Sequence, residues 1–201
     1  METNNKIIQF YKKDPVLYNA ILQLDHLIKP EPSVDVYKSL LASIVSQQLS
    51  TKVADIIWQR FTDLFISRYP HPNILLEMPH EEVRKVGLSN NKVKYVKNVA
   101  EFSQNNDISF EFLQQRTDVE IIDYLTQIKG VGKWTVQMIL MFPMDRPNVF
   151  PVDDLGIQRA IKNLYNVALE KKELKQELIK ISDNWHPYKT LACKYLWKII
   201  D

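Results

Sequence analysis

The chain has 201 residues, of which 45% are hydrophobic and 25% charged, a composition typical of a folded globular protein. A membrane-spanning helix is not expected, because no apolar run of about 18 residues occurs. The polar residues near the start of the chain argue against a secretion signal. The net charge of +2 permits a nucleic-acid partner without indicating one, because DNA affinity would require a local cluster of cations.

The cysteine and histidine content limits the cofactors that the chain could hold. Its one cysteine, Cys193, cannot form an internal disulfide, which fits a reducing cytoplasm. An iron–sulfur cluster is not expected, because such a cluster takes several thiolate ligands. The four histidines are scattered without the spacing of metal ligands. We therefore expect no required cofactor and a cytoplasmic location, associated with the nucleoid if the protein is bacterial.

Apolar side chains recur with helical spacing along nearly the whole chain, and the predicted fold class is all-α. Asp35, Ser50 and Ser89 stand where helix N-caps are expected, and Gly87 suits a left-handed position after a helix. The only extended piece expected is 148–152. In chain order, helices are predicted over 16–28, from 35, from 50 to about 65, within 69–79, over 81–86 and 91–102, from 118 to before 130, and over 133–141, 154–165, 171–182 and 187–200.

Two of the four glycines lie in one loop, Lys129-Gly130-Val131-Gly132-Lys133, between two predicted helices. Glycine lets another group approach the backbone closely, and the first N–H groups of a helix lie at the positive end of its dipole. Such a loop can therefore bind a phosphate through its backbone. The alternative is a tight helical hairpin whose glycines serve only the turn.

Asp153 and Asp154 precede the apolar face of a predicted helix. One carboxylate could cap the helix and the other could complement its dipole, so a purely structural role is open. Neighbouring helical residues do not face each other, so the two carboxylates do not form an acid–base pair.

A polar corner at Gln47, Gln48 and Ser50 joins two predicted helices, and by itself it indicates only a junction. The lysines of 92–97 are interpreted as a solvent-facing helix surface, with a phosphate contact from Lys92 as the alternative.

Four motifs follow one another between residues 37 and 197. They are the polar corner 43–50, the hairpin segment 127–135, the segment 154–159, and the tryptophan-rich segment 185–197. In this order they resemble the helix-hairpin-helix superfamily of DNA glycosylases, and within it the branch of 3-methyladenine DNA glycosylase II. Lys129, which stands where proline is usual, and Met138, which stands where an aromatic residue is often found, depart from the pattern.

The resemblance implies two helical lobes with a DNA-binding cleft between them. The middle bundle, with the hairpin, would span 35–145, and 1–34 together with 146–201 would form the second lobe. Because the motifs begin by about residue 37, the separate N-terminal β-containing domain of some relatives is not expected.

The resemblance also assigns DNA contacts. The hairpin would grip the DNA backbone, and Gln48 would fill the duplex at the place of a flipped base, while Ser50 would offer an N–H to a phosphate. Backbone carbonyls could hold a structural monovalent cation. The hairpin contacts are assigned to Gly130, Val131, Gly132, Lys133 and Thr135, and the cation ligands to the carbonyls of Thr126, Ile128 and Val131.

Catalysis is assigned to Asp154, and Asp153 is left as the N-cap or a supporting contact. Trp134 occupies the position at which strand-cutting relatives carry a lysine that forms a Schiff base, so no lyase activity is expected. Trp134, Trp197 and Met138 would form the lesion pocket, in which aromatic faces attract a cationic purine.

The implied function is that of a monomeric, monofunctional DNA glycosylase, which binds double-stranded DNA and removes alkylated purines such as 3-methyladenine or 7-methylguanine in base excision repair. Two alternatives stay open. One is a helix-hairpin-helix module that binds DNA without catalysis, and the other is a glycosylase for a mismatched or deaminated base.

Overall fold

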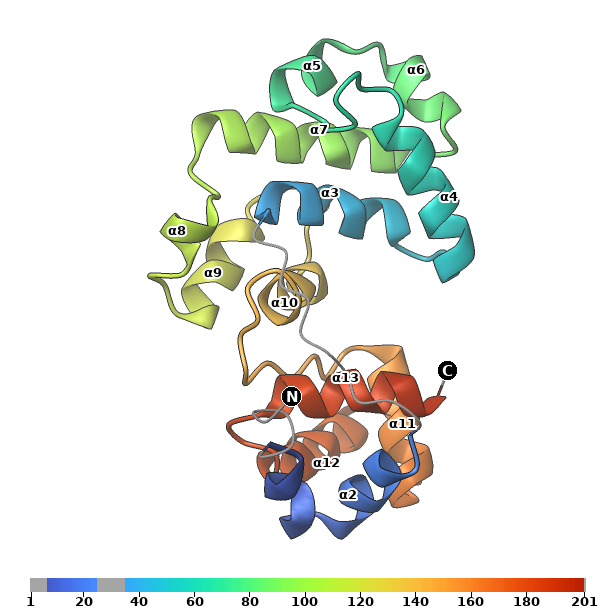
Figure 1. Ribbon diagram of the computed structural model, residues 1–201, viewed down its shortest axis with the longest axis vertical. Helices are drawn as coiled ribbons and strands as arrows, with labels where there is room; N and C mark the ends of the chain where they lie inside the picture. The colour runs from blue at the N-terminus through green and yellow to red at the C-terminus, as the bar shows by residue number, and fades with distance from the viewer. Residues whose placement is uncertain (1–6, 25–34, 201) are drawn as a thin grey trace. The chain divides into compact units, whose positions relative to one another are not determined.

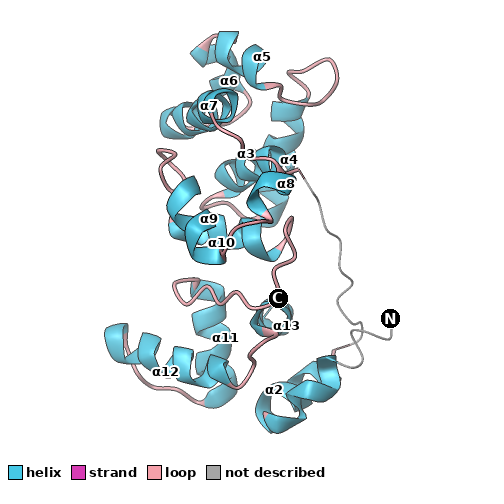
Figure 2. Ribbon diagram, turned by 90° about the vertical axis from the view of Figure 1, so that its left-hand side faces the viewer, coloured by secondary structure: helices cyan, strands magenta, loops and turns pink. Residues whose placement is uncertain are grey.

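The computed structural model describes residues 7–24 and 35–200, and this part of the chain is helical, with no β-strand (Figure 2). None of the helices in the described ranges has the length and apolar character needed to cross a membrane. In chain order, the elements are η1 (Tyr11–Lys13), α2 (Pro15–Leu22), α3 (Val36–Ser46), α4 (Thr51–Thr62), α5 (Pro72–Glu77), α6 (His80–Lys85), α7 (Asn90–Asn105), α8 (Phe110–Leu113), α9 (Asp118–Leu125), α10 (Lys133–Met141), α11 (Leu155–Tyr165), α12 (Lys171–Asp183) and α13 (Lys189–Ile200).

The described chain forms two compact units. The central unit contains residues 35–144, and the end unit contains 7–24 and 145–200. The end unit is therefore made from both ends of the chain, and each unit has its own buried core.

In the central unit, α7 packs against α3 on one side and against α5 and α6 on the other (Figure 1). The valines at 93, 96 and 99 of α7 recur with helical spacing and are fully buried. Helix α10 packs against α3 and α9, and its residues from Thr135 to Met141 are all buried. The hairpin before α10 is thus anchored to a helix that forms part of the core.

In the end unit, α11 packs against α13 and α2. Asp14 is a buried carboxylate of this unit and is 6% exposed. Its Oδ1 accepts a hydrogen bond from the N–H of Leu17 at 3.2 Å and so caps α2. Its Oδ2 accepts hydrogen bonds from the Tyr165 hydroxyl at 2.7 Å and from the Trp185 indole N–H at 2.8 Å. One carboxylate thereby joins the first described segment to α11 and to the segment before α13.

Most helices expected from periodicity are present, but their ends differ. Helix α2 ends at Leu22, whereas the prediction ran to 28, and residues 25–28 lie outside the described ranges. Helix α4 ends at Thr62 rather than near 65. The short helix α8, capped by the Ser109 hydroxyl, was not predicted. The segment 148–152 is not a strand, because it turns back on itself with a hydrogen bond from the N–H of Val152 to the carbonyl of Phe150.

The predicted caps can be compared with the observed ones. Asp35 accepts a hydrogen bond from the N–H of Lys38 at 2.8 Å, and Ser89 accepts one from the N–H of Lys92 at 3.3 Å, so both caps are confirmed. Ser50 holds the N-cap position of α4, but its side chain makes no capping hydrogen bond. Helix α9 is capped by Thr117, which forms a capping box with Glu120.

Candidate functional site

The hairpin between α9 and α10 is closed by two turn hydrogen bonds. The N–H of Ile128 donates to the carbonyl of Leu125 at 3.2 Å, and the N–H of Val131 donates to the carbonyl of Ile128 at 2.9 Å. The side chains of Ile128 and Val131 are buried and anchor the loop. The N–H of Val131 closes the turn, and the predicted contact of this residue with DNA stays a prediction.

The two hairpin glycines differ in their surroundings. Gly130 has a φ of +105°, and a Cβ placed there would lie 2.2 Å from Cγ of Tyr95 on α7. Both the backbone conformation and the contact with Tyr95 therefore require glycine at 130. A Cβ at Gly132 would meet no atom within 4 Å. Gly132 is thus not required for packing, and its lack of a side chain leaves the start of α10 open.

The start of α10 has the properties of an anion site. Gly132 is its N-cap and supplies no side chain to the first-turn N–H groups, which also lack acceptors within the helix. Gly132 and Lys133 are exposed, as is Lys129. Exposed lysines beside the positive end of a helix dipole favour the binding of a phosphate.

Thr135 lies one turn further along α10 and is only 2% exposed. Its Oγ1 accepts a hydrogen bond from Nε2 of Gln47 at 3.4 Å. The hydroxyl is buried and directed toward Gln47, and the predicted contact of Thr135 with DNA stays a prediction. The contact couples the polar corner to the hairpin helix.

Gln48 is exposed at the tip of the polar corner and has a φ of +59°. A left-handed conformation at a residue other than glycine costs free energy, which the surrounding structure must offset. Nζ of Lys92, on α7, donates hydrogen bonds to the carbonyls of Val45 and Gln47, at 2.8 and 2.7 Å. Lys92 thus binds the end of α3 and the residue that precedes Gln48.

The lysines of 92–97 are therefore only in part a solvent-facing surface. Lys97 donates in the same way to the carbonyls of Leu76 and Met78, at the end of α5. Burial lowers the pKa of Lys92. The interpretation of Lys92 and Lys97 as solvated is corrected, because both ammonium groups cap helix C-termini.

Ser50 follows the corner and is exposed at the start of α4. Since its hydroxyl makes no capping hydrogen bond, the first N–H groups of α4 are not satisfied by their cap residue. The helix starts of α4 and α10 are alike in this respect, and both belong to segments for which DNA contacts were predicted.

Trp134 and Met138 lie one turn apart on α10. Trp134 is half-buried, and Met138 is 8% exposed. Residues four apart share one face of a helix, so α10 places an aromatic ring and a flexible thioether side by side. No amine occupies position 134.

In the end unit, Asp154 is the N-cap of α11 and is 8% exposed. Its Oδ1 accepts a hydrogen bond from the N–H of Ile157 at 2.8 Å and another from the indole N–H of Trp197 at 2.9 Å. Trp197 comes from α13, which packs against α11. Two donors on one oxygen fix the orientation of a carboxylate at the positive end of a helix.

Asp153 has a different environment. It is exposed and forms an ion pair with Lys175 of α12. The suggestion that Asp153 caps the helix is corrected, because Asp154 is itself the N-cap. Of the two carboxylates, only Asp154 is buried and held by donors from two helices.

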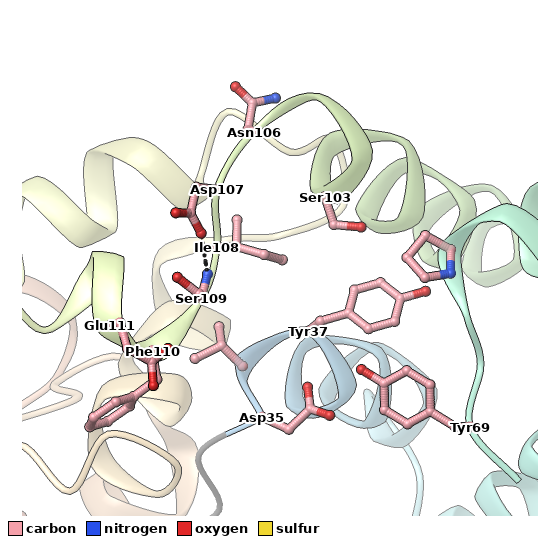
Figure 3. Close-up of a pocket in the computed structure, with 12 residues that line it drawn as sticks. Asp35, Tyr37, Tyr69, Ser103, Asn106, Asp107, Ile108, Ser109, Phe110 and Glu111 are labelled. Carbon is pink, nitrogen blue, oxygen red and sulfur yellow. Dashed lines mark hydrogen bonds between the residues drawn. The ribbon is translucent and has the colours of Figure 1, made fainter. Parts of the chain in front are cut away.

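A separate cavity of about 480 Å³ lies in the central unit. Tyr37, Tyr69 and Asp35 line one part of it, and Asp107, which accepts a hydrogen bond from the N–H of Ser109 at 2.8 Å, lines another (Figure 3). None of the predicted site residues lines this cavity.

The structure thus gathers the predicted residues into two groups, one in each unit. In the central unit, the hydrogen bond between Gln47 and Thr135 joins the polar corner to the helix of the hairpin and of Trp134. In the end unit, Asp154 and Trp197 meet directly. Sequence reasoning missed the roles of Gln47 and Lys92, whose contacts join segments far apart in the chain. The position of Gln47 beside Gln48 was the only local signal.

These features define a helical protein with a glycine hairpin and a buried helix-capping aspartate. Residues 41–184 match the model of the HhH-GPD superfamily of base excision DNA repair proteins. The chain belongs to this superfamily.

The chain is also similar to individual proteins, both in sequence and in structure. DNA-3-methyladenine glycosylase 1 of Schizosaccharomyces pombe is 36% identical over 172 residues, which cover 85% of this chain and 73% of that protein. The Bacillus subtilis protein YfjP is 33% identical over 172 residues, or 83% of this chain, and the match spans only 59% of its length. The structure of the S. pombe 3-methyladenine DNA glycosylase Mag1 in complex with abasic DNA has a TM-score of 0.86 and 30% identity, covering 96% of this chain and 95% of that one.

Proposed function

We propose that the chain is a monofunctional DNA glycosylase, which acts as a monomer on duplex DNA and hydrolyses the N-glycosidic bond of alkylated purines in base excision repair. The observation that carries the proposal is the buried Asp154 carboxylate, held at the start of α11 by two N–H donors. The similar proteins named as 3-methyladenine glycosylases support the same assignment.

The DNA backbone is bound by the exposed start of α10. Gly132 and Lys133 present backbone N–H groups and a cation to a phosphate. Ser50, at the start of α4, offers a second helix terminus of the same kind. Such contacts position the duplex without reading its sequence, which suits an enzyme that must find damage in any sequence.

Gln48 fills the duplex after the damaged nucleotide is flipped out. Its side chain is exposed at the tip of a corner that is held on both sides, by Lys92 and by the contact between Gln47 and Thr135. A rigid support is required for this role, because the inserted residue must offset the lost stacking of the flipped base.

Asp154 stabilises the sugar during bond cleavage. The bond between C1′ and the purine nitrogen breaks, and its electron pair leaves with the base, neutralising the positive charge of the alkylated ring. Positive charge develops on the sugar, and a fixed carboxylate beside it lowers the barrier. A water oxygen then adds to C1′ and loses a proton. Because the base departs as a good leaving group, a second carboxylate is not required.

Recognition of the cationic base is assigned to aromatic faces. Trp134 offers an indole on α10 with Met138 beside it, and Trp197 offers one on α13. Aromatic faces attract cations, and this attraction favours an alkylated purine over a neutral one. With tryptophan at 134, no Schiff base forms there, and the DNA strand stays intact.

The hairpin carbonyls could hold a monovalent cation. The carbonyls of Thr126 and Val131 accept no backbone hydrogen bond from the described residues, whereas that of Ile128 accepts one from Val131. Carbonyl oxygens are suitable ligands for hard cations. A cation held here would add positive charge near the phosphate bound by α10.

Release of free bases from duplex DNA with a single 7-methylguanine tests the proposal. Native protein is expected to release the base without nicking the strand. Asp154→Asn should lose about a hundredfold or more of the rate while still binding the duplex, because it removes the charge beside the sugar. Asp153→Asn is the matched control and should keep its activity, since its carboxylate forms a surface ion pair with Lys175.

Two results would contradict the proposal. An inactive Asp153→Asn beside an active Asp154→Asn would move the catalytic role to the exposed carboxylate. Native protein that binds the duplex but releases no alkylated base would instead indicate a DNA-binding module. A panel of duplexes with deaminated or mismatched bases would show whether a different lesion is the substrate.

A further inference from the structure

Gly156, in the first turn of α11, lies close to the Asp154 carboxylate and to the indole of Trp197. A Cβ at this position would lie 3.1 Å from Oδ1 of Asp154, and 3.1 and 3.2 Å from Cδ1 and Nε1 of Trp197. The contact with Cδ1 is shorter than the roughly 3.5–4.0 Å of carbon atoms in ordinary contact. A side chain at this position would therefore require the carboxylate or the indole that binds it to move by a few tenths of an ångström.

The backbone does not call for glycine at this position. Gly156 lies within a helix and, unlike Gly130, is not among the glycines with positive φ. Glycine within a helix is unfavourable relative to alanine. Its presence here is thus explained by the close approach of Trp197 to Asp154.

The indole of Trp197 supplies the donor that α11 cannot. The helix itself gives Oδ1 of Asp154 one hydrogen bond, from the N–H of Ile157. The second comes from Nε1 of Trp197, on α13, at 2.9 Å. A hydrogen bond from a second helix further restrains the rotation of the carboxylate about its bond to Cβ.

We propose that Gly156 and Trp197 are positioning residues, which orient the Asp154 carboxylate. Gly156 leaves the space, and the Trp197 N–H holds Oδ1. This role of Trp197 depends on its N–H and is separate from any stacking of its ring on the base. The inference rests on the proposed catalytic role of Asp154.

A correctly oriented anion matters in the bond-breaking step more than in binding. Charge on the sugar develops only in the transition state, so a carboxylate that is displaced or free to rotate lowers the rate of that step. Binding of the duplex by α10 and α4 is not affected by such a change. Substitutions of Gly156 or Trp197 that disturb the carboxylate are therefore expected to lower the maximal rate without weakening DNA binding.

The test is single-turnover release of 7-methylguanine from duplex DNA, measured at a series of enzyme concentrations that all exceed the DNA concentration. This measurement separates the maximal rate from the half-saturating enzyme concentration. Trp197→Phe keeps an aromatic ring but removes the donor, and Gly156→Ala keeps both functional side chains. Each should lower the maximal rate about tenfold, the effect of losing a hydrogen bond to a charged group, and leave half-saturation unchanged.

A double variant and a control complete the experiment. Gly156→Ala combined with Trp197→Phe should be little slower than either single variant, because both changes act on one contact. Trp58→Phe is the matched control, since Trp58 is a half-buried tryptophan of α4 that stacks on Phe61. It should leave both kinetic parameters unchanged.

Thermal unfolding of each variant separates positioning from folding. Gly156→Ala should keep the native unfolding temperature to within a few degrees, because alanine favours the helix. If Gly156→Ala unfolds at the assay temperature, the maximal rate of Trp197→Phe is the test of the inference.

Other results would overturn the inference. A Trp197→Phe variant with a native maximal rate and weaker half-saturation would show that the ring only binds the base. Native rates in both variants would show that the contact does not orient Asp154. An active Asp154→Asn would instead contradict the proposed function itself.

Discussion

The buried carboxylate of Asp14 connects several segments of the end unit by hydrogen bonds. It caps α2 through the N–H of Leu17, and it also accepts hydrogen bonds from Tyr165 and Trp185, which are distant in the chain. Nothing in its neighbourhood along the chain signals this role beyond Pro15, which suits the first position of a helix.

Asp14→Ala is expected to destabilise the protein by about 3 kcal/mol, because the hydroxyl of Tyr165 and the indole N–H of Trp185 would be left buried without their acceptor. Urea unfolding followed by tryptophan fluorescence measures the change. Asp63→Ala is a suitable control, because Asp63 pairs with Arg68 on the surface and should change stability by less than about 1 kcal/mol. An Asp14→Ala variant as stable as the native protein would contradict the structural role of Asp14.

The hairpin glycines should separate stability from DNA binding. Gly130→Ala is expected to destabilise the fold by more than about 2 kcal/mol, since the methyl group would overlap Tyr95 and the backbone has a positive φ. Gly132→Ala should keep the native stability and weaken binding to undamaged duplex about tenfold, because its methyl group lies where a phosphate approaches the start of α10. Thermal unfolding measures the stability of the two variants, and fluorescence anisotropy measures their binding to duplex DNA. A loss of stability in Gly132→Ala together with weaker binding by a stable Gly130→Ala would contradict these roles.

At the scale of elements, the polar corner depends on a helix that follows it in the chain. Lys92, on α7, holds the carbonyls at the end of α3. The contact of Gln47 with Thr135 adds a second support from α10. The conformation of the polar corner therefore depends on contacts among α3, α7 and α10.

Lys92→Met keeps the length of the side chain but removes the ammonium group. We expect a loss of stability of about 1–2 kcal/mol, because two carbonyls at the end of a helix lose their donor. We also expect slower base release from duplex DNA, because Gln48 loses support. Lys94→Met, an exposed position on the same helix, is the control. A Lys92→Met variant with native stability and rate would show that the corner needs no such anchor.

At the scale of the whole molecule, both units contain buried tyrosines. Burial raises the pKa of Tyr11 and Tyr165 in the end unit, and of Tyr37 in the central unit. It also raises the pKa of Tyr69 to about 12, with a further contribution from Asp35. In the folded protein these phenols keep their protons above pH 10.

This arrangement predicts alkaline unfolding. The phenols lose their protons near pH 10 in the unfolded chain but not in the folded one, so the unfolded state binds fewer protons. Stability is then fully present below about pH 10 and falls as the pH rises further. Tyrosinate absorbance and helix content, measured together from pH 8 to 13, should show part of the tyrosines ionising only as the helices melt. Complete ionisation with intact helices would contradict the burial of these side chains.

The sequence alone determined the all-α class and the positions of most helices, because the periodicity of apolar residues and the capping residues are local properties. It also located the hairpin, since two glycines between helices form a compact signal. Its predictions failed at the ends of α2 and α4, where periodicity continues past the last helical turn. They also failed at α8, which is too short to show a period.

Tertiary structure alone decided how the site residues are held. Asp153 and Asp154 are neighbours with the same side chain, and only the fold buries one at the start of α11 and pairs the other with Lys175. In the same way, Thr135 is directed inward and Lys92 binds carbonyls of another helix. Such contacts join residues that are distant in the chain, so the free energy that selects them arises only when the helices pack.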